Sequence, residues 1–364
     1  MSNFQQRPAA DILSAAWPAR TDAALTWLRW SMAVHGGQGS AHSYSPLFGW
    51  ARAYPETTGY LIPTLLDYAE LKKDAGLVQA ALGCADWLCS IQLPGGAFPG
   101  LLAGHRQPSV FNTAQILFGL ARIVEDRGET ALGARCRTAL RHATVWLLAT
   151  LETDGSWRQA AYVPGFVPSY YTRAIWGVLR ANQILQSTEV EGAMRRALQF
   201  YAGRFLPNGA IRDWGFWPDK PAFTHTMAYT VEGFLESALR LDEAAILQKT
   251  ISSADKFLAL VDTKIGLAGR YDAAWRGDHS FLCLTGHAQW SIIFQRLYAL
   301  TGAEKYLLAA QLLLVQLLDH QVLGRNWHTH GALPGSAPIW GPYLRLRYPN
   351  WGAKFLLDAM KNFK

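Results

Sequence analysis

The sequence predicts an all-α protein built from six helical hairpins that close into a ring. Three observations lead to this prediction. A pattern of helix, glycine-containing turn, short loop and second helix recurs with a period of about 55 to 60 residues. The second helix of each pair is apolar nearly all round, as in "AIWGVLRANQIL", which is typical of a helix buried on every side. The first and last of these second helices both begin after the same Tyr-Pro pair.

The hairpins follow one another along the chain without a linker. In each, a turn such as "QLPGGAF" or "ETDGSW" separates the two helical stretches, because glycine accepts the backbone angles of tight turns. The period is longer than that of the common short solenoid repeats. We expect the hairpins over residues 24–71, 85–123, 144–185, 198–239, 254–300 and 312–360.

The two Tyr-Pro pairs indicate that the ring closes. Pro55 and Pro349 each open a second helix, where proline is tolerated because its missing N–H would have no partner within the helix. In a closed ring of six hairpins, the first and last inner helices are neighbours. Matching helix starts at Tyr54 and Tyr348 are therefore expected to lie close together.

Composition indicates one large domain. The chain has 364 residues, of which 50% are hydrophobic and 17% charged, so it can bury a substantial core. We expect residues 1–22 to form an N-terminal extension and residues 23–364 to form a single domain. The first residues lack a basic head followed by an apolar run, and no stretch reaches the roughly 18 apolar residues of a membrane span. We therefore expect a cytoplasmic protein.

Charge and cysteine content exclude several classes of protein. The net charge of +7 favours an anionic partner, but the basic residues are scattered and no nucleic-acid motif is present. The four cysteines have no CxxC spacing, which fits reduced and mostly buried thiols. The sequence contains no glycine-rich phosphate loop or dinucleotide fingerprint, so we expect no nucleotide cofactor.

At this level the chain resembles the (α/α)6 toroids, a group that includes six-hairpin glycosidases, uronate lyases and epimerases, and terpene cyclases. "IQLPGGAFPG" and "LETDGSWRQ" are similar to turns of squalene-cyclase repeats and of pectate-lyase-like toroids. "TGHAQWSIIFQRLYALTGAEKYLLAA" resembles a segment of unsaturated glucuronyl hydrolases and glucuronyl C5-epimerases. The resemblance implies an (α/α)6 toroid with a central cleft, lined by the loops that enter the inner helices.

Polar and aromatic residues concentrate at those loops, a combination suited to sugars, whose C–H faces stack on aromatic rings. We therefore predict a polysaccharide or oligosaccharide substrate, with uronates favoured by the net charge, and a role beside a polysaccharide biosynthesis system. The predicted substrate-binding residues are His42, Tyr44, Tyr60, Asn112, Arg173, Trp214, Trp217, Arg276, His287, Tyr348, Asn350 and Trp351.

Two chemistries remain open for such a cleft. A glycosidase needs two facing carboxyl groups, whereas a lyase or epimerase removes the proton beside a uronate carboxylate with Tyr or His as base or acid. Glu56 and Asp278 are the first candidates for catalytic acids, and a helix-dipole role for Glu56 is the competing interpretation. The further catalytic candidates are Asp213, Tyr171 and His225.

The alternatives are a non-catalytic toroid that binds a glycan or protein, and an enzyme of the terpene cyclase or prenyltransferase type. The Asp-rich box of squalene-type cyclases is missing from the sequence. Cys283 and His287 are four residues apart and could share a helix face as zinc ligands, but no third ligand follows at a recognisable spacing. We therefore expect no metal site.

Overall fold

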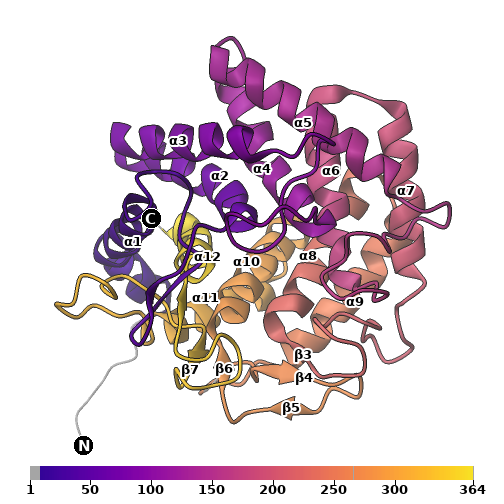
Figure 1. Cartoon of the computed structure of the whole chain (residues 1–364). Coiled ribbons are helices and arrows are strands. Elements are labelled where there is room, and N and C mark those ends of the chain that lie inside the picture. The colour runs from indigo at the N-terminus through magenta and orange to yellow at the C-terminus, as the bar shows by residue number, and fades with distance from the viewer. Residues whose placement is uncertain (1–8, 265, 364) are drawn as a thin grey trace, which may run out of the picture.

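Twelve α-helices form two concentric layers in the computed structural model, which describes residues 9–264 and 266–363 (Figure 1). The expected all-α (α/α)6 toroid is confirmed. The inner layer holds the second helix of each hairpin: α2 (Pro55–Lys72), α4 (Val110–Arg127), α6 (Thr172–Leu185), α8 (Thr224–Arg240), α10 (Leu284–Thr301) and α12 (Asn350–Met360). The outer layer holds the first helices: α1 (Ala9–Ala33), α3 (Ala75–Ile91), α5 (Ala131–Ala149), α7 (Thr188–Ala202), α9 (Ala244–Leu260) and α11 (Glu304–Leu318).

Helix α1 starts earlier than the sequence indicated. Residues 9–22, which we expected to precede the domain, form its first turns, and Pro18 lies inside the helix rather than at its start. Trp17 is buried, and its indole N–H donates a hydrogen bond to the carbonyl of Met360 in α12 (3.1 Å). This part of the helix therefore packs with the domain. Residues 1–8 of the expected extension lie outside the described residues.

The first and last inner helices close the ring. The Tyr68 hydroxyl of α2 donates a hydrogen bond to the carbonyl of Leu357 in α12 (2.7 Å). Just before these helices, β1 (Ser43–Ser45) pairs antiparallel with β8 (Tyr348–Pro349). In Figure 1 the yellow C-terminal helix accordingly lies beside the indigo N-terminal ones. The matching Tyr-Pro starts are therefore neighbours in space, as the sequence predicted.

Glycines allow the inner helices to pack closely. A Cβ atom added at Gly119 of α4 would lie 2.2 Å from the carbonyl oxygen of Gly59 in α2. One added at Gly177 of α6 would lie 2.3 Å from the carbonyl oxygen of Ala114 in α4. Atoms cannot approach to these distances, so a larger residue at either position would force the helices apart. Close packing explains why the inner helices are buried nearly all round.

Short strands fix the loops at one end of the ring. β1 lies between β2 (Gly49–Trp50) and β8, and a second small sheet is formed by β3 (Ala222–Phe223), β4 (Arg270–Tyr271) and β5 (Gly277–Asp278). A third pairs β6 (Leu282–Cys283) with β7 (Ser336–Ala337). β3, β6 and β8 each run directly into an inner helix and so hold its first turn in place. The remaining elements are the 3-10 turns η1 (Ser169–Tyr171) and η2 (Lys361–Phe363). Among the described residues, no helix is long and apolar enough to span a membrane.

Candidate active site

The loops that lead into the inner helices surround a pocket of about 480 Å³. This volume lies within the range of roughly 300–1,000 Å³ that is usual for ligand sites. The first turns of α2, α4, α8 and α12 form its wall together with η1, which precedes α6. They contribute Glu56, Asn112, Tyr170, His225 and Trp351. The pocket thus lies at the end of the inner layer where the sequence analysis placed the cleft.

Glu56 is the one acidic side chain among the described residues that line the pocket. It is 7% exposed, and its Oε2 accepts a hydrogen bond from the Tyr54 hydroxyl (2.6 Å). Burial raises the pKa of the Glu56 carboxyl to about 7, although the Tyr54 hydrogen bond and the charge of Arg173 both oppose the rise. A carboxyl with this pKa can both donate and accept a proton near neutral pH.

Two histidines face the same pocket. His225, 4% exposed, lies at the start of α8, with its Nδ1 2.7 Å from Oε1 of Gln289. Burial lowers the pKa of His225 to about 3. His42 precedes β1, and burial together with the nearby charge of Arg347 lowers its pKa to about 4. Both imidazoles are therefore neutral at physiological pH.

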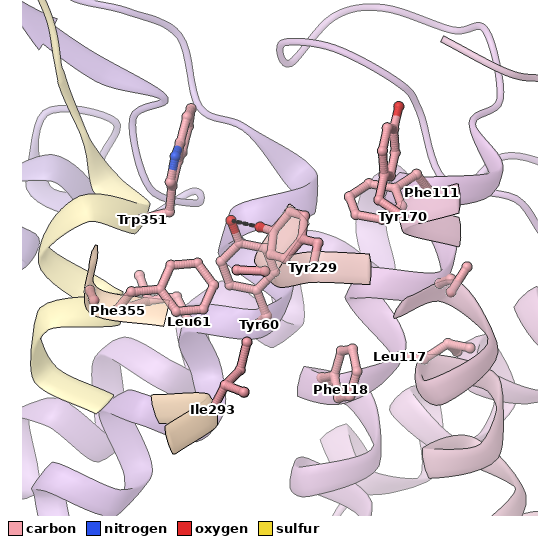
Figure 2. Close-up of a cluster of buried hydrophobic side chains, with 14 of the residues drawn as sticks. Tyr60, Leu61, Phe111, Leu117, Phe118, Tyr170, Tyr229, Ile293, Trp351 and Phe355 are labelled. Atoms are coloured by element: carbon pink, nitrogen blue, oxygen red, sulfur yellow. Dashed lines mark hydrogen bonds between the residues drawn. The ribbon is translucent and has the colours of Figure 1, made fainter. Parts of the chain in front are cut away.

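Two tyrosines form the floor of the pocket. The Tyr229 hydroxyl of α8 donates a hydrogen bond to the Tyr60 hydroxyl of α2 across the ring (3.2 Å). Figure 2 shows this pair between Trp351 on one side and Phe111 and Tyr170 on the other. The floor therefore joins helices that are far apart in the sequence.

Arg173 of α6 lies beneath this floor rather than in the pocket lining. Its guanidinium carbon is 4.6 Å from the centre of the Tyr229 ring. The guanidinium also forms an ion pair with Glu232 and donates from Nε to the side-chain oxygen of Gln115 (2.8 Å). These contacts come from Nε and Nη1 and fix the guanidinium under the Tyr229 ring, which supports the floor.

The mouth of the pocket carries exposed aromatic rings. Tyr162 is 60% exposed and Trp217 is 48% exposed, and both line the opening. Arg347 is the one lysine or arginine among the described lining residues. Its position gives the otherwise uncharged mouth a site for an anionic group.

The structure brings together part of the predicted set. Residues that line the pocket are Glu56, His225, His42, Tyr60, Asn112, Trp217 and Trp351. Residues outside its lining are Asp278, Asp213, Tyr171, Tyr44, Arg173, Trp214, Arg276, His287, Tyr348 and Asn350.

The two predicted residues of the fifth hairpin loop, Asp278 and Arg276, lie at the surface. Asp278 accepts hydrogen bonds from Ser280 and forms an ion pair with Arg270 (2.8 Å), and these partners hold the pKa of its carboxyl below the usual value. Arg276 is 84% exposed and pairs with Asp272 (2.7 Å). Because each charge has a local partner within the loop, neither side chain reaches the pocket.

Three other candidates have structural contacts. Asp213 forms an ion pair with Arg204 (3.4 Å). Trp214 is buried and packs edge-on against Phe257, with ring centres 5.9 Å apart. Tyr171 is buried at the end of η1, just behind the Tyr170 that does line the pocket. Adjacent residues such as Tyr170 and Tyr171 can therefore lie one in the pocket lining and the other in the core.

The candidates near the ring closure connect the first hairpin to the last one. Tyr44 and Tyr348 are paired residues of β1 and β8. Asn350 is buried at the start of α12, where its side-chain amide donates hydrogen bonds to the hydroxyls of Thr57 (2.8 Å) and Ser40 (3.0 Å). These residues support the pocket wall without lining it.

His287 and Cys283 do not form part of a metal cluster. His287 lies outside the pocket, and its Nε2 accepts a hydrogen bond from the backbone N–H of Leu267 (3.2 Å). The described residues contain no group of three or more His, Cys, Asp or Glu side chains arranged to hold a metal ion.

Sequence reasoning missed several lining residues: Tyr54, Tyr162, Phe216, Tyr229 and Arg347. Tyr229 could have been found, because it lies four residues after His225 and therefore on the same face of α8. Tyr162 lies in the loop between the helices of the third hairpin, and no periodic pattern marks its contact with the pocket.

Comparison with solved structures gives full-length matches to the same architecture. An unsaturated glucuronyl hydrolase specific for heparin matches with a TM-score of 0.76 and 16% identity, covering 97% of both chains. The unsaturated glucuronyl hydrolase of Bacillus sp. GL1 matches at 0.74 and 13%, covering 94% of this chain and 96% of that one. The cellobiose 2-epimerase of Spirochaeta thermophila matches at 0.71 and 15%, covering 99% of both.

At these identities the similarity shows a shared fold. No protein-family model matches the chain, and no curated protein matches it either. The chemistry of this pocket must therefore be argued from its own residues.

Proposed function

We propose that the chain is a carbohydrate-active enzyme that binds an oligosaccharide with a uronate unit and transfers protons beside the uronate carboxylate, as an epimerase or lyase does. The observation that carries the proposal is the contrast between Glu56 and His225 in one pocket. Burial raises the pKa of the carboxyl and lowers that of the imidazole. Near pH 7 the carboxyl can therefore donate a proton, while the neutral imidazole has one unprotonated ring nitrogen that can accept a proton. Titratable groups whose pKa values are pushed apart in this way are typical of an acid and base pair.

The proton transfer can be written with these residues. His225 accepts the proton from the carbon next to the carboxylate, and the C–H electron pair enters an enolate. Arg347 stabilises the negative charge on the carboxylate oxygens. Glu56 then supplies a proton, either to the carbon in an epimerisation or to the departing glycosidic oxygen in an elimination, in which the C–O bond breaks as the C=C bond forms.

Hydrolysis by the usual glycosidase mechanism has less support. That mechanism uses two carboxyl groups on either side of the scissile bond. Glu56 is the single carboxyl among the described lining residues, and the second candidate, Asp278, is paired with Arg270 at the surface.

The pocket and the solved structures both support a saccharide. Aromatic rings bind the C–H faces of sugars, and here they line the wall and the mouth of the pocket. The exposed rings of Tyr162 and Trp217 at the opening can stack on a sugar unit. The names of the similar structures, glucuronyl hydrolase and cellobiose 2-epimerase, also denote proteins that act on saccharides.

One experiment separates the possibilities. The protein is incubated in D₂O with a panel of uronate and neutral oligosaccharides, and the products are examined by proton NMR, by absorbance of an unsaturated uronate and by reducing-end release. We expect loss of the proton beside the carboxylate on uronate substrates. Reducing-end release without deuterium incorporation or unsaturation would overturn the proposal in favour of hydrolysis. Saccharide binding without any change would point to a non-catalytic toroid.

A further inference from the structure

The imidazole of His225 has one close polar contact, and it comes from another inner helix. Gln289 of α10 is buried, and its side-chain oxygen lies 2.7 Å from Nδ1 of His225. With the amide oxygen of Gln289 turned towards the ring, as in this structure, the contact places the proton of the neutral imidazole on Nδ1, because an amide oxygen only accepts hydrogen bonds. The other ring nitrogen, Nε2, then carries the lone pair.

We propose that Gln289 is a positioning residue that holds His225 in the Nδ1–H tautomer, so that Nε2 presents its lone pair to the bound sugar. The part of this inference that concerns the sugar rests on the proposed function. The tautomer itself rests on the contact between the two side chains with the amide oxygen facing the ring, and it can be measured without any substrate.

The local packing of α8 and α10 is built to make this contact. A Cβ atom at Gly286 would lie 2.3 Å from the Thr224 hydroxyl oxygen and 3.0 Å from the backbone nitrogen of His225. The absence of a side chain at Gly286 therefore lets the first turns of the two helices touch. Gln289 follows three residues later on the same helix face, which directs its side chain at His225. Trp290 strengthens the crossing, because its indole N–H donates to the carbonyl of Thr224 (3.3 Å).

The choice of an amide matters because, among the described residues, the groups that pack against the His225 ring carry no negative charge. Tyr229 packs against the ring from the same helix (centres 4.3 Å apart), and Tyr343 does so from the loop before α12 (5.3 Å). Arg173 of α6 adds positive charge, and the Cys283 thiol lies near the backbone N–H of His225. A carboxylate at position 289 would instead favour the imidazolium ion. The neutral amide orients the ring while leaving it unprotonated and able to act as a base.

The first test reads the tautomer in the wild-type protein. Long-range proton–nitrogen NMR of the histidine rings distinguishes Nδ1–H from Nε2–H, with His225→Asn identifying the signal. We expect the Nδ1–H tautomer for His225. An Nε2–H signal would mean that the amide nitrogen of Gln289 faces the ring, and it would overturn the inference.

The second test uses variants. Gln289→Leu removes the acceptor and should cut kcat about 10- to 100-fold, the usual effect of losing a group that orients a histidine, with less than a twofold change in KM. Gln289→Glu keeps the acceptor and should restore the Nδ1–H tautomer while moving the acid side of the pH–rate profile to higher pH. Gln295→Leu is the matched control, because Gln295 lies on the same helix and bonds to Ser291 and Ala359 instead. It should leave the tautomer and kcat unchanged.

The outcomes separate this inference from the proposed function. Full kcat in Gln289→Leu, or a loss of the same size in Gln295→Leu, would refute the positioning role. If wild type shows the Nδ1–H tautomer, Gln289→Leu loses it and no saccharide is altered by any form of the protein, the tautomer assignment stands and the proposed function fails.

Discussion

Replacing Glu56 with glutamine tests whether this carboxyl is held in its acid form by burial. The wild-type pKa rises from 4.5 in the unfolded chain to about 7 in the folded protein. Below about pH 4.5 the carboxyl is protonated in both states, so its effect on folding is fully favourable there. As the pH increases through 4.5 towards 7, the unfolded chain releases its proton first, and the folded state loses stability relative to it.

The magnitude follows from the same two values. Each pH unit between them corresponds to about 1.4 kcal/mol, so the wild type loses roughly 3 kcal/mol between pH 4.5 and pH 8 on account of this group. Glu56→Gln cannot ionise and does not suffer this loss. We therefore expect the free energy of unfolding of the variant, relative to wild type, to be about 3 kcal/mol higher at pH 8 than at pH 4.5.

Urea unfolding of both proteins at the two pH values measures this difference, because other titrating groups cancel in the comparison. Turnover of the substrate found in the saccharide panel is measured on the same samples, and it should drop by a factor on the order of a hundred or more. If the stability difference between variant and wild type is the same at both pH values, Glu56 is not held protonated by burial and the assignment of the acid fails.

Three further substitutions test other parts of the argument. Asp278→Asn should leave turnover unchanged and cost less than about 1 kcal/mol in a urea unfolding assay, because its partner Arg270 is a surface residue; a large loss of turnover would return Asp278 to the site. Gly119→Ala should destabilise the fold by about 1–3 kcal/mol, since the added methyl would meet Gly59, and an unchanged unfolding midpoint would contradict the close packing of α2 and α4. Trp217→Ala should raise KM for oligosaccharides but not for the smallest substrate, with kcat nearly unchanged; equal effects on both would remove Trp217 from the mouth of the pocket.

The fold could be predicted because its causes are periodic. Each hairpin repeats the same order of outer helix, turn and inner helix, and the inner helices show their burial as apolar residues on all faces. The Tyr-Pro pairs at Pro55 and Pro349 also pointed to closure, because the first and last inner helices are neighbours in a closed ring. The start of α1 could not be predicted from this pattern, because residues 9–22 precede the first repeat and carry no matching turn or Tyr-Pro signal.

The pocket lining was most predictable where a residue sits in the first turn of an inner helix. Glu56, Asn112 and His225 were found for this reason, because the ring geometry points all such turns at one opening. Loop residues followed no such rule. Asp278 pairs with Arg270 of its own loop and does not reach the pocket. Tyr348 was predicted to bind substrate, but the residue before it, Arg347, lines the pocket instead. Which way a loop side chain turns depends on partners that only the folded chain brings together.

The burial that shifts the pKa values of Glu56 and His225 would also affect how the pocket receives an anion. Desolvation disfavours charge on any group, so it protonates Glu56 and deprotonates His225 and His42 near neutral pH. A protonated Glu56 does not repel an incoming carboxylate, and Arg347 becomes the dominant charge at the mouth. Under the proposed function, the negative charge of a uronate paired with Arg347 would in turn favour the imidazolium form of a nearby histidine. Binding of the substrate would thereby strengthen the base at the moment it is needed, which a permanently charged pocket could not do.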